Sequence, residues 1–270
     1  MPDILRLLFG SLVLRPYVFA FLAVHLLGAS AFLGWRRMCA FTLITWVVAF
    51  AAEASSIRTG IPFGWYYYLP RTADRELWIA GVPFFDSLSF PFLLVASYGL
   101  TWTLLGKPPA GTRLTCEAWP RPAPWSHLGV TAALFVLLDV VIDPVALRGD
   151  RWFLGQIYGY PEPGLYFGVP LANFVGWGVV GVAATALYRA WERRQPERPT
   201  VRLRGRALLC PGLYFFVLTF NLAITGALRE WGLLIASLGL SVPILAWTAM
   251  VLSAPGAFRE RSRGEGVHIA

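Results

Sequence analysis

Seven apolar runs, each close to the length that crosses a lipid bilayer, constrain the fold of this chain more than any other feature. They lie at about residues 17–35, 39–54, 84–105, 127–142, 169–190, 207–226 and 231–252. A helix needs about 20 mainly apolar residues to cross the hydrocarbon core, and the second and fourth runs reach that length once their terminal acids are counted as helical. Only 14% of the 270 residues are charged, as in integral membrane proteins. We therefore expect an all-α, polytopic membrane helix bundle of about seven transmembrane helices, with residues 1–252 forming one domain.

The basic residues indicate how these helices are oriented. With seven spans, 15 of the 23 Lys and Arg residues fall on the face that carries loops 1–2, 3–4 and 5–6 and the C-terminal tail. By the positive-inside rule that face is cytoplasmic, so the N-terminus is expected outside and the C-terminus in the cytoplasm. The net charge of +8 thus follows topology and does not indicate nucleic-acid binding. The basic stretch at 189–206 is interpreted as a cytoplasmic anchor or, second, as a surface for anionic membrane lipid.

The remaining segments are polar or rich in proline. Residues 107–125 contain five prolines and predict an extended connector, 192–206 predict a solvated loop, and 253–270 predict a disordered cytoplasmic tail. The first apolar run has no cleavage site after it, so it is expected to remain as a helix. The three cysteines are far apart and form no C-x-x-C pair, which favours neither a disulfide framework nor a metal site.

Six of the helix ends carry acidic or amide side chains, and all six fall on the same predicted membrane face. Ionisable groups in membrane helices cost roughly 2.5–3.5 kcal/mol each at the helix centre, and they usually face an interior cavity. Their convergence at one depth predicts a reaction or transport site. These residues are Glu53, Asp86, Asp139, Asp143, Asn173, Asn221 and Glu230.

Asp139 and Asp143 are the most informative pair, because residues four apart share one face of a helix. Two carboxylates this close do not both ionise readily, so one is expected to keep its proton at neutral pH. Such a carboxylic acid in an apolar cavity can protonate a poor base. The alternative is structural: Asp143, which precedes Pro144, ends its helix while Asp139 bonds a neighbouring helix.

The other polar residues have two interpretations each. Arg58 could pair with Glu53 and keep it ionised as a base or water-positioning group, or the pair could be an interfacial ion pair of little value. Asp86 and Asn173 could hold a water molecule, or they could cap helix N-termini. Asn221 could serve the site or form an interhelical hydrogen bond.

The two long loops on the acidic face, residues 55–83 and 144–170, resemble each other. Each follows an acid near the end of a helix, is rich in aromatic residues, and returns through Gly-Val-Pro, at 81–83 and 168–170, with a polar residue three positions later. We interpret this as a weak internal repeat. Most of the loop aromatics fit an interfacial belt, while a few, Tyr66 among them, are candidates to line a pocket for a flat apolar molecule or to stabilise a cation.

Missing motifs exclude several function classes. Three histidines, at 25, 127 and 268, do not make the histidine-rich cluster of a membrane di-iron hydroxylase. The single lysine, Lys107, lies at a helix end, so a retinal Schiff base is excluded. No P-loop, G-x-G-x-x-G or G-x-S-x-G motif is present. We expect no metal and no cofactor.

Four segments together resemble the membrane carotenoid-biosynthesis proteins, which include carotenoid 1,2-hydratases acting on γ-carotene-type or bisanhydrobacterioruberin-type substrates. They are EASSIRTGIPFGWYYY at 53–68, GVPFF at 81–85, LDVVIDPVA at 138–146 and YFGVPLANFVGW at 166–177, and the similarity covers about residues 40–250. The resemblance implies a hydro-lyase in a bacterial or archaeal cell membrane. It would add water, without a cofactor, to the terminal 1,2 double bond of an acyclic ψ-end group to give a tertiary alcohol. The implied partners are a carotenoid from the bilayer and other enzymes of the carotenoid pathway.

This reaction suggests roles for the acids. Asp143 would protonate the alkene, with Asp139 keeping it protonated, and a tertiary carbocation would form. Glu53 and Asp86 would orient or deprotonate the attacking water, with Asn173 fixing the geometry. The candidates for binding substrate or water are Asn173, Arg58, Tyr66, Trp177 and Asn221.

Two other functions fit the same residues less well. A membrane terpenoid or carotenoid cyclase would share the protonation step but would need a drier pocket. A lipid or proton-coupled transporter also carries acids in its helices, but it would place them at the midplane and along an exit path.

Overall fold

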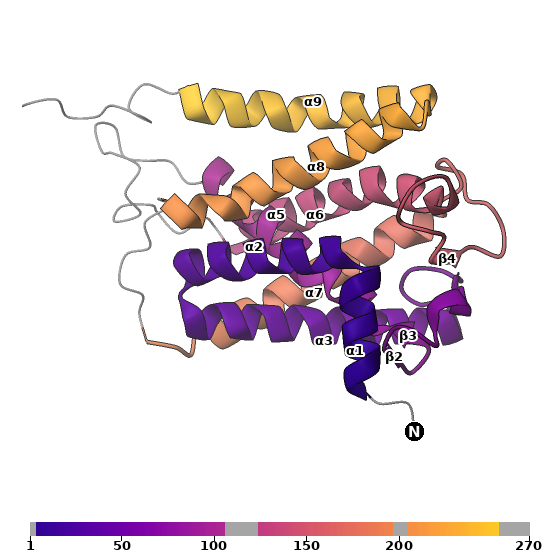
Figure 1. Ribbon diagram of the computed structural model, residues 1–270. Coiled ribbons are helices and arrows are strands. Elements are labelled where there is room, and N and C mark those ends of the chain that lie inside the picture. The colour runs from indigo at the N-terminus through magenta and orange to yellow at the C-terminus, as the bar shows by residue number, and fades with distance from the viewer. Residues whose placement is uncertain (1–3, 106–123, 197–204, 254–270) are drawn as a thin grey trace, which may run out of the picture.

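The computed structural model describes residues 4–105, 124–196 and 205–253, and it confirms the expected helix bundle (Figure 1). Seven helical segments in these residues are long and apolar enough to cross a membrane. The predicted proline-rich connector up to residue 123, the part of the loop at 197–204 and the predicted tail from residue 254 lie outside the described residues. The helices are α1 (Ile4–Leu14), α2 (Pro16–Leu33), α3 (Trp35–Thr59), α4 (Phe84–Ser87), α5 (Ser89–Leu105), α6 (Pro124–Ala146), α7 (Leu171–Glu192), α8 (Leu209–Ala227) and α9 (Trp231–Ser253).

Short elements complete the fold. There are 3-10 turns at Pro70–Thr72, Gly149–Arg151 and Gly205–Leu208, the last of which leads into α8. The strands β1 (Tyr67–Tyr68) and β4 (Tyr158–Gly159) form one small sheet, and β2 (Trp78–Ile79) and β3 (Val82–Pro83) form another. All four strands lie in the two long loops, at one end of the bundle.

Three helix boundaries differ from the prediction, and each difference affects the acids. α3 continues six residues beyond Glu53, to Thr59, and α6 continues through Pro144 to Ala146. Asp143 therefore does not end its helix, and the structural interpretation based on Pro144 is wrong. The third predicted helix is divided, because α4 ends at Ser87 and α5 begins at Ser89. Asp86 therefore lies on a separate turn that precedes the spanning part.

α1 was not predicted, because its 11 residues are too short to cross a membrane. In Figure 1 it runs across the direction of the spanning helices. It packs so closely on the first long loop that a Cβ on Gly10 would lie 1.9 Å from the carbonyl oxygen of Arg75. Arg15, which follows α1, pairs with Glu76 of the same loop at 3.2 Å, and both side chains are buried. α1 therefore holds the first loop against the bundle.

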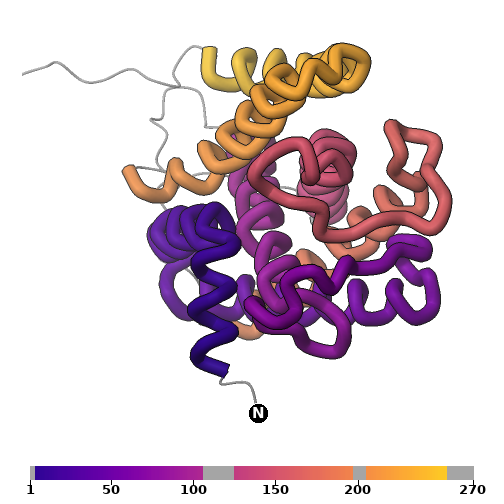
Figure 2. Tube along the Cα trace, turned by 45° about the vertical axis from the view of Figure 1, so that its right-hand side comes forward, coloured from indigo at the N-terminus to yellow at the C-terminus, as the bar shows by residue number. Residues whose placement is uncertain are grey.

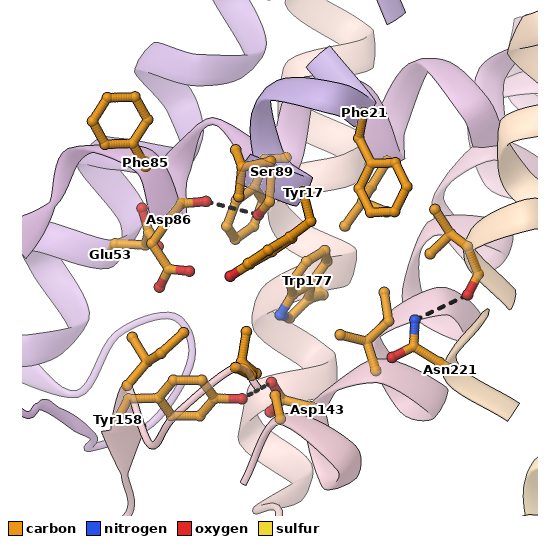
Figure 3. Close-up of a pocket in the computed structure, with 18 of the residues that line it drawn as sticks. Tyr17, Phe21, Glu53, Phe85, Asp86, Ser89, Asp143, Tyr158, Trp177 and Asn221 are labelled. Carbon is orange, nitrogen blue, oxygen red and sulfur yellow. Dashed lines mark hydrogen bonds between the residues drawn. The ribbon is translucent and has the colours of Figure 1, made fainter. Parts of the chain in front are cut away.

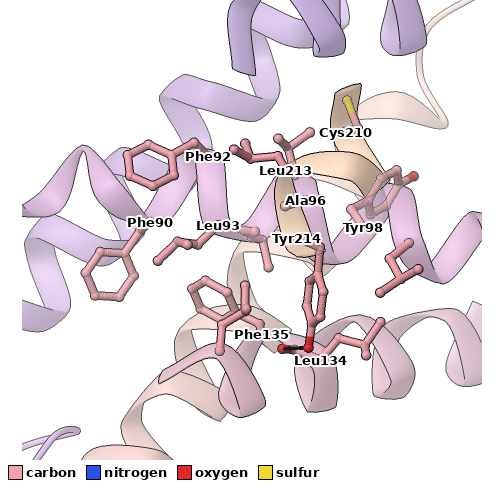
Figure 4. Close-up of a cluster of buried hydrophobic side chains, with 14 of the residues drawn as sticks. Phe90, Phe92, Leu93, Ala96, Tyr98, Leu134, Phe135, Cys210, Leu213 and Tyr214 are labelled. Carbon is pink, nitrogen blue, oxygen red and sulfur yellow. Dashed lines mark hydrogen bonds between the residues drawn. The ribbon is translucent and has the colours of Figure 1, made fainter. Parts of the chain in front are cut away.

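α5 is the central helix, because most of its residues are buried in the bundle. Figure 4 shows its aromatic and aliphatic side chains packed against α6 and α8. Tyr214 of α8 is fully buried here, and its hydroxyl donates to the carbonyl of Leu134 in α6 at 3.0 Å. α9, in contrast to α5, lies on the outside of the bundle, where exposed Ile235 and Met250 face lipid. The labelled members of the core are Phe90, Phe92, Leu93, Ala96, Tyr98, Leu134, Phe135, Cys210, Leu213 and Tyr214.

Candidate active site

The two long loops are joined to each other at one end of the bundle. β1 and β4 pair antiparallel, with Tyr68 directly opposite Tyr158. One further bond extends the pairing, because the amide of Leu69 donates to the carbonyl of Ile157 at 2.8 Å. Figure 2 shows the loops side by side over the ends of the helices. Residues about 90 positions apart in the sequence thus cover the same site.

Each loop ends in a hairpin of the same geometry, just before the next helix. Ala80 and Gly81 form the tip of the first, with φ of 51° and 83°, and Phe167 and Gly168 form the tip of the second, with φ of 50° and 96°. Positive φ at both central residues is characteristic of a type I′ turn, and the residues flanking each tip pair across it. The repeat predicted from the two Gly-Val-Pro tripeptides is therefore a structural repeat.

An arginine ties each helix end to its hairpin tip. Arg58 donates to the carbonyl four residues earlier in α3 at 2.5 Å and to the carbonyl of Ala80 at 2.6 Å. Arg148 donates to the carbonyl four residues earlier at 2.7 Å and to that of Phe167 at 3.4 Å. Arg58 thus binds backbone carbonyls and not, as the sequence suggested, the carboxylate of Glu53. It belongs to the scaffold of the repeat.

Beneath the joined loops lies a cavity of about 170 Å³. Carboxyl and hydroxyl groups occupy two parts of its wall, one near Glu53 and one near Asp143, while most of the remaining lining is aromatic and aliphatic (Figure 3). The cavity brings together seven of the ten residues that the sequence nominated, the exceptions being Asp139, Arg58 and Glu230. The seven are Glu53, Asp86, Asp143, Asn173, Tyr66, Trp177 and Asn221.

The first cluster is centred on Glu53, which is almost fully buried. Tyr68 donates to its Oε1 at 2.8 Å, and Ser87 donates to its Oε2. Asp86, one residue before Ser87, shares this wall and is partly exposed to the cavity. Tyr68 and Asp86 line the same cavity as Glu53.

The second cluster is centred on Asp143, whose carboxyl accepts three hydrogen bonds. Tyr158 donates to Oδ1, while Tyr160 and Asn173 donate to Oδ2 at 2.7 and 2.9 Å. The Asn173 amide also donates to Asp139 Oδ2 at 2.8 Å, and the other oxygen of Asp139 is buried with no hydrogen-bond partner among the described residues. Asp139 does not line the cavity and contacts the site through Asn173. Neither Asn173 nor Asp86 caps a helix N-terminus.

Tyrosines connect the two clusters. Tyr66 lies with its hydroxyl 3.5 Å from that of Tyr68, and its ring packs edge-on against Tyr158 at a centroid distance of 6.3 Å. Burial, reinforced by the neighbouring carboxyl groups, raises the pKa of Tyr68 and Tyr158 well above the ordinary value for tyrosine. Burial and Asp143 do the same to the pKa of Tyr160. These hydroxyls therefore remain protonated donors over the whole physiological pH range.

The two clusters correspond in the repeat but differ in one important position. Glu53 and Asp143 are equivalent, and each accepts a bond from the tyrosine 15 residues later. Asp86 and Asn173 are also equivalent, three residues after each Gly-Val-Pro proline. The first cluster therefore has a second carboxyl group where the second cluster has an amide donor. Equivalent backbone positions thus carry different chemistry.

Two nominated polar groups have other surroundings. Glu230 lies outside the cavity, where it pairs with Arg148 at 3.1 Å and with Arg151. Hydrogen bonds from these two arginines lower the pKa of Glu230. Asn221 does line the cavity, and its amide donates to the carbonyl of Val217 in its own helix at 2.9 Å, not to another helix.

Sequence reasoning missed four hydroxyl groups that hold the carboxyls, namely those of Ser87, Tyr68, Tyr158 and Tyr160. The tyrosines were hidden among many loop aromatics. The signal that identifies two of them is the equal spacing of 15 residues from Glu53 to Tyr68 and from Asp143 to Tyr158. Among the residues that the structure describes, no group of three or more His, Cys, Asp or Glu side chains could hold a metal ion.

Residues 8–254 match the protein family described as carotenoid biosynthesis protein. Over 216 residues the chain is 29% identical to the bisanhydrobacterioruberin hydratase of Haloarcula japonica. That alignment covers 79% of this chain but 62% of the relative, so the chain spans less than two thirds of the relative's length. No solved structure matches the chain. Because the family match extends over nearly the whole chain and includes every residue of both clusters, this protein belongs to the carotenoid biosynthesis protein family.

Proposed function

We propose that this protein is a carotenoid hydratase, a hydro-lyase that adds water to the terminal 1,2 double bond of an acyclic ψ-end group. The observation that carries the proposal is the composition of one cavity: Glu53, Asp86 and Asp143 line it, and the remaining lining is largely apolar. An apolar wall suits a hydrocarbon end group, and acids at two places on it suit proton donation and proton removal. The family and the hydratase relative support the same class of reaction.

The proton donor in this proposal is Asp86. It shares a wall of the cavity with Glu53, so the two carboxyl groups are best satisfied by one proton between them. Both oxygens of Glu53 already accept hydrogen bonds, which favours the ionised form there. In this proposal the proton therefore belongs to Asp86.

Asp143 serves as the carboxylate. Three donors hold it, Tyr158, Tyr160 and Asn173, and hydrogen bonds to a carboxylate stabilise its charged form. This distribution of roles differs from the sequence hypothesis, in which Asp143 was the acid. Asp139, buried behind Asn173, then takes part by keeping the amide oriented toward Asp143.

The reaction follows from these roles. The Asp86 proton adds to C2 of the end group, and the positive charge develops at C1, which carries two methyl groups. The electron-rich rings of Tyr66 and Trp177 line the cavity and can stabilise this cation. The oxygen of a water molecule bonds to C1 and its proton passes to Asp143, and a proton returns to Asp86 through water or the tyrosine hydroxyls. The net change is the addition of one water.

The test is expression in a bacterium that accumulates lycopene and γ-carotene, grown in heavy-oxygen water. We expect pigments heavier by one water that carry solvent oxygen. Asp86→Asn and Asp143→Asn should each lower the product at least 100-fold, since general acid–base groups contribute about 10²–10⁴. Asp74→Asn, at an exposed site in the first loop, is the matched control. An altered spectrum with unchanged mass would indicate cyclisation instead, and full activity in Asp86→Asn would reject the assigned donor.

The orientation is part of the proposal. The excess of basic residues on the opposite end of the helices supports placing the joined loops outside the cell. Asp74→Cys, in the first loop, should react in whole cells with a membrane-impermeant maleimide above the background of the parent chain. Reaction only after the cells are opened would reverse the orientation.

A further inference from the structure

The helices α2 and α8 diverge toward the end of the bundle that carries the candidate site. At Gly28 they touch, because a Cβ there would lie 2.9 Å from the Cβ of Leu209 and 3.2 Å from the Sγ of Cys210. Figure 1 shows α8 turning away from α2 toward the end with the strands. At that end both helices line the same cavity, α2 through Phe21 and α8 through Phe220.

Aromatic rings line this divergence from the cavity to the outer surface. Phe21 packs edge-on against Phe220 at a centroid distance of 6.5 Å and against Phe216 at 5.8 Å. Phe153, from the second loop, packs against Phe220 at 6.3 Å and against Tyr17 at 5.8 Å. Phe216 and Phe153 are 59% and 65% exposed. The same set of rings therefore contacts the cavity and the surface that faces lipid.

The volume of the cavity requires such an opening if the substrate is a carotenoid. About 170 Å³ is close to the size of an engineered cavity of roughly 150 Å³ that binds benzene. It can enclose an end group but not a polyene long enough to extend through a hydrocarbon core about 30 Å thick. Most of the substrate must therefore lie outside the cavity, in contact with apolar surface.

We propose that the polyene chain leaves the cavity through a gap between α2 and α8 that opens when the rings of Phe21 and Phe220, which touch edge-on in this structure, move apart. The terminal double bond then lies at the two carboxyl clusters. This inference rests on the proposed function, whose substrate it places. The end of the bundle is less suitable as an entrance for the polyene, because the joined loops cover it and bring carboxyl and hydroxyl groups there. Of the residues that line the cavity, those at this gap form an aromatic surface that runs from Phe21 and Phe220 inside to exposed Phe153 on the outer surface.

Binding is measured first, without turnover, in the Asp86→Asn background. The variant is purified from the pigment-accumulating bacterium, and the pigment retained per protein is determined by absorbance. Adding Phe21→Ala and Phe220→Ala together should reduce retention at least tenfold. Phe21→Leu and Phe220→Leu, which keep apolar bulk, should lie between. Phe9→Ala, on the exposed side of α1, should retain as much as the background.

Turnover then separates the two proposals. The chain with intact carboxyls is given lycopene and, separately, a C10 acyclic hydrocarbon with the same terminal double bond. The gap variants should lose at least tenfold in kcat/KM on lycopene and little on the short hydrocarbon, while Asp143→Asn should lose both activities. Unchanged pigment retention in the correctly folded Ala variants would overturn the gap. If the Ala variants retain less pigment but the parent chain hydrates neither hydrocarbon, the binding position would stand and the proposed hydratase function would be overturned.

Discussion

Phe90 and Trp177 stack face to face, with ring centroids 4.3 Å apart and planes inclined by 17°. Each stands seven residues after the proline of its Gly-Val-Pro tripeptide, so equivalent residues of the two repeats meet in the core. Tyr68 and Tyr158, also equivalent, meet in the same way in the small sheet. An approximate two-fold axis therefore passes through both contacts. It relates α3 and α5 to α6 and α7 with the same direction across the membrane, as in parallel repeats of other membrane proteins.

The stacked pair should contribute strongly to stability. Trp177→Ala should destabilise the protein by about 3–5 kcal/mol, the range for large aromatic residues truncated in a core. Trp177→Phe keeps an aromatic face against Phe90, so its cost should be clearly smaller. Thermal unfolding in detergent, followed by circular dichroism, measures both. Equal melting temperatures for the Ala and Phe variants would show that the stack does not hold the repeats together.

Exchanging the two unequal positions tests whether the repeats have separate roles. Asn173→Asp removes the amide that donates to Asp139 and Asp143 and adds a carboxyl group beside them, so activity should fall at least 100-fold. The double variant Asp86→Asn with Asn173→Asp should remain inactive, because Tyr160 serves Asp143 and has no counterpart at Glu53 in the described hydrogen bonds. Initial rates of product formation decide this. Recovery in the double variant would mean that the two clusters are interchangeable.

Removing the Tyr160 hydroxyl should destabilise the charged form of Asp143 while leaving its carboxyl group in place. Tyr160→Phe deletes the 2.7 Å bond to Asp143, and hydrogen bonds to charged groups contribute about 1.5–3 kcal/mol. If this hydrogen-bond free energy is lost from the transition state, kcat should fall about 10–100-fold. Tyr67→Phe, in the neighbouring strand and 48% exposed, is the control and should keep full activity. A Tyr160→Phe enzyme with the parent's kcat and pH profile would remove this tyrosine from the site.

Replacing either arginine should lower stability, because both make equivalent bonds to backbone carbonyls; Arg148→Ala also removes the ion pair with Glu230. Arg58→Ala and Arg148→Ala each remove bonds from a charged donor to two backbone carbonyls, for an expected loss of about 1.5–3 kcal/mol in stability. Both should also lower kcat, since each hairpin precedes the turn that carries Asp86 or Asn173. The free energy of unfolding, from denaturation, and kcat are measured for each variant. Arg71→Ala, at an exposed position, is the control. A loss confined to one of the two arginines would contradict the repeat.

Alkaline pH should destabilise the folded protein through the buried tyrosines. The folded-state pKa of Tyr158 is raised above the unfolded value of about 10. Below that pH the tyrosine is protonated in both states, so the full stability is present and does not change with pH through this group. Above it the unfolded chain releases a proton that the folded chain keeps, and stability falls by about 1.4 kcal/mol per pH unit for each such tyrosine. The sequence has ten tyrosines, so the comparison with Tyr158→Phe is needed to isolate the contribution of this one. Between pH 9 and 11, the melting temperature should fall less steeply with pH in Tyr158→Phe than in the parent protein. Identical slopes in the two proteins would argue against a raised pKa of Tyr158.

Much of the fold could be predicted, because hydropathy is a local property of the sequence. The seven spans and the acids near their ends followed from run length and from the cost of charge in a membrane. The 11-residue helix α1 was invisible to this argument, since it is shorter than a span and is held by the distant contacts of Gly10 and Arg15 with the first loop. Of the acids that the sequence placed together, Glu53, Asp86 and Asp143 line one cavity, whereas Asp139 and Glu230 do not line it.

The partners of these acids could not be predicted, because they depend on pairing between loops. Tyr158 reaches Asp143 only in a loop that β1 and β4 hold in register. The suggested bond from Arg58 to Glu53 failed for the same reason, since the hairpin carbonyl of Ala80 was not visible in the sequence as a competing acceptor. Roles assigned to single residues of a cluster therefore required the loops to be in place.

Because both carboxyl clusters lie at one end of the bundle, the proposed function means that the protein hydrates one tip of a long molecule at a time. A carotenoid with two acyclic tips must leave, invert in the bilayer and bind again before its second tip is hydrated. The first alcohol anchors the hydrated tip among the lipid headgroups and opposes that inversion. A singly hydrated pigment should therefore accumulate before the doubly hydrated one, with its hydroxyl in the leaflet that faces the joined loops.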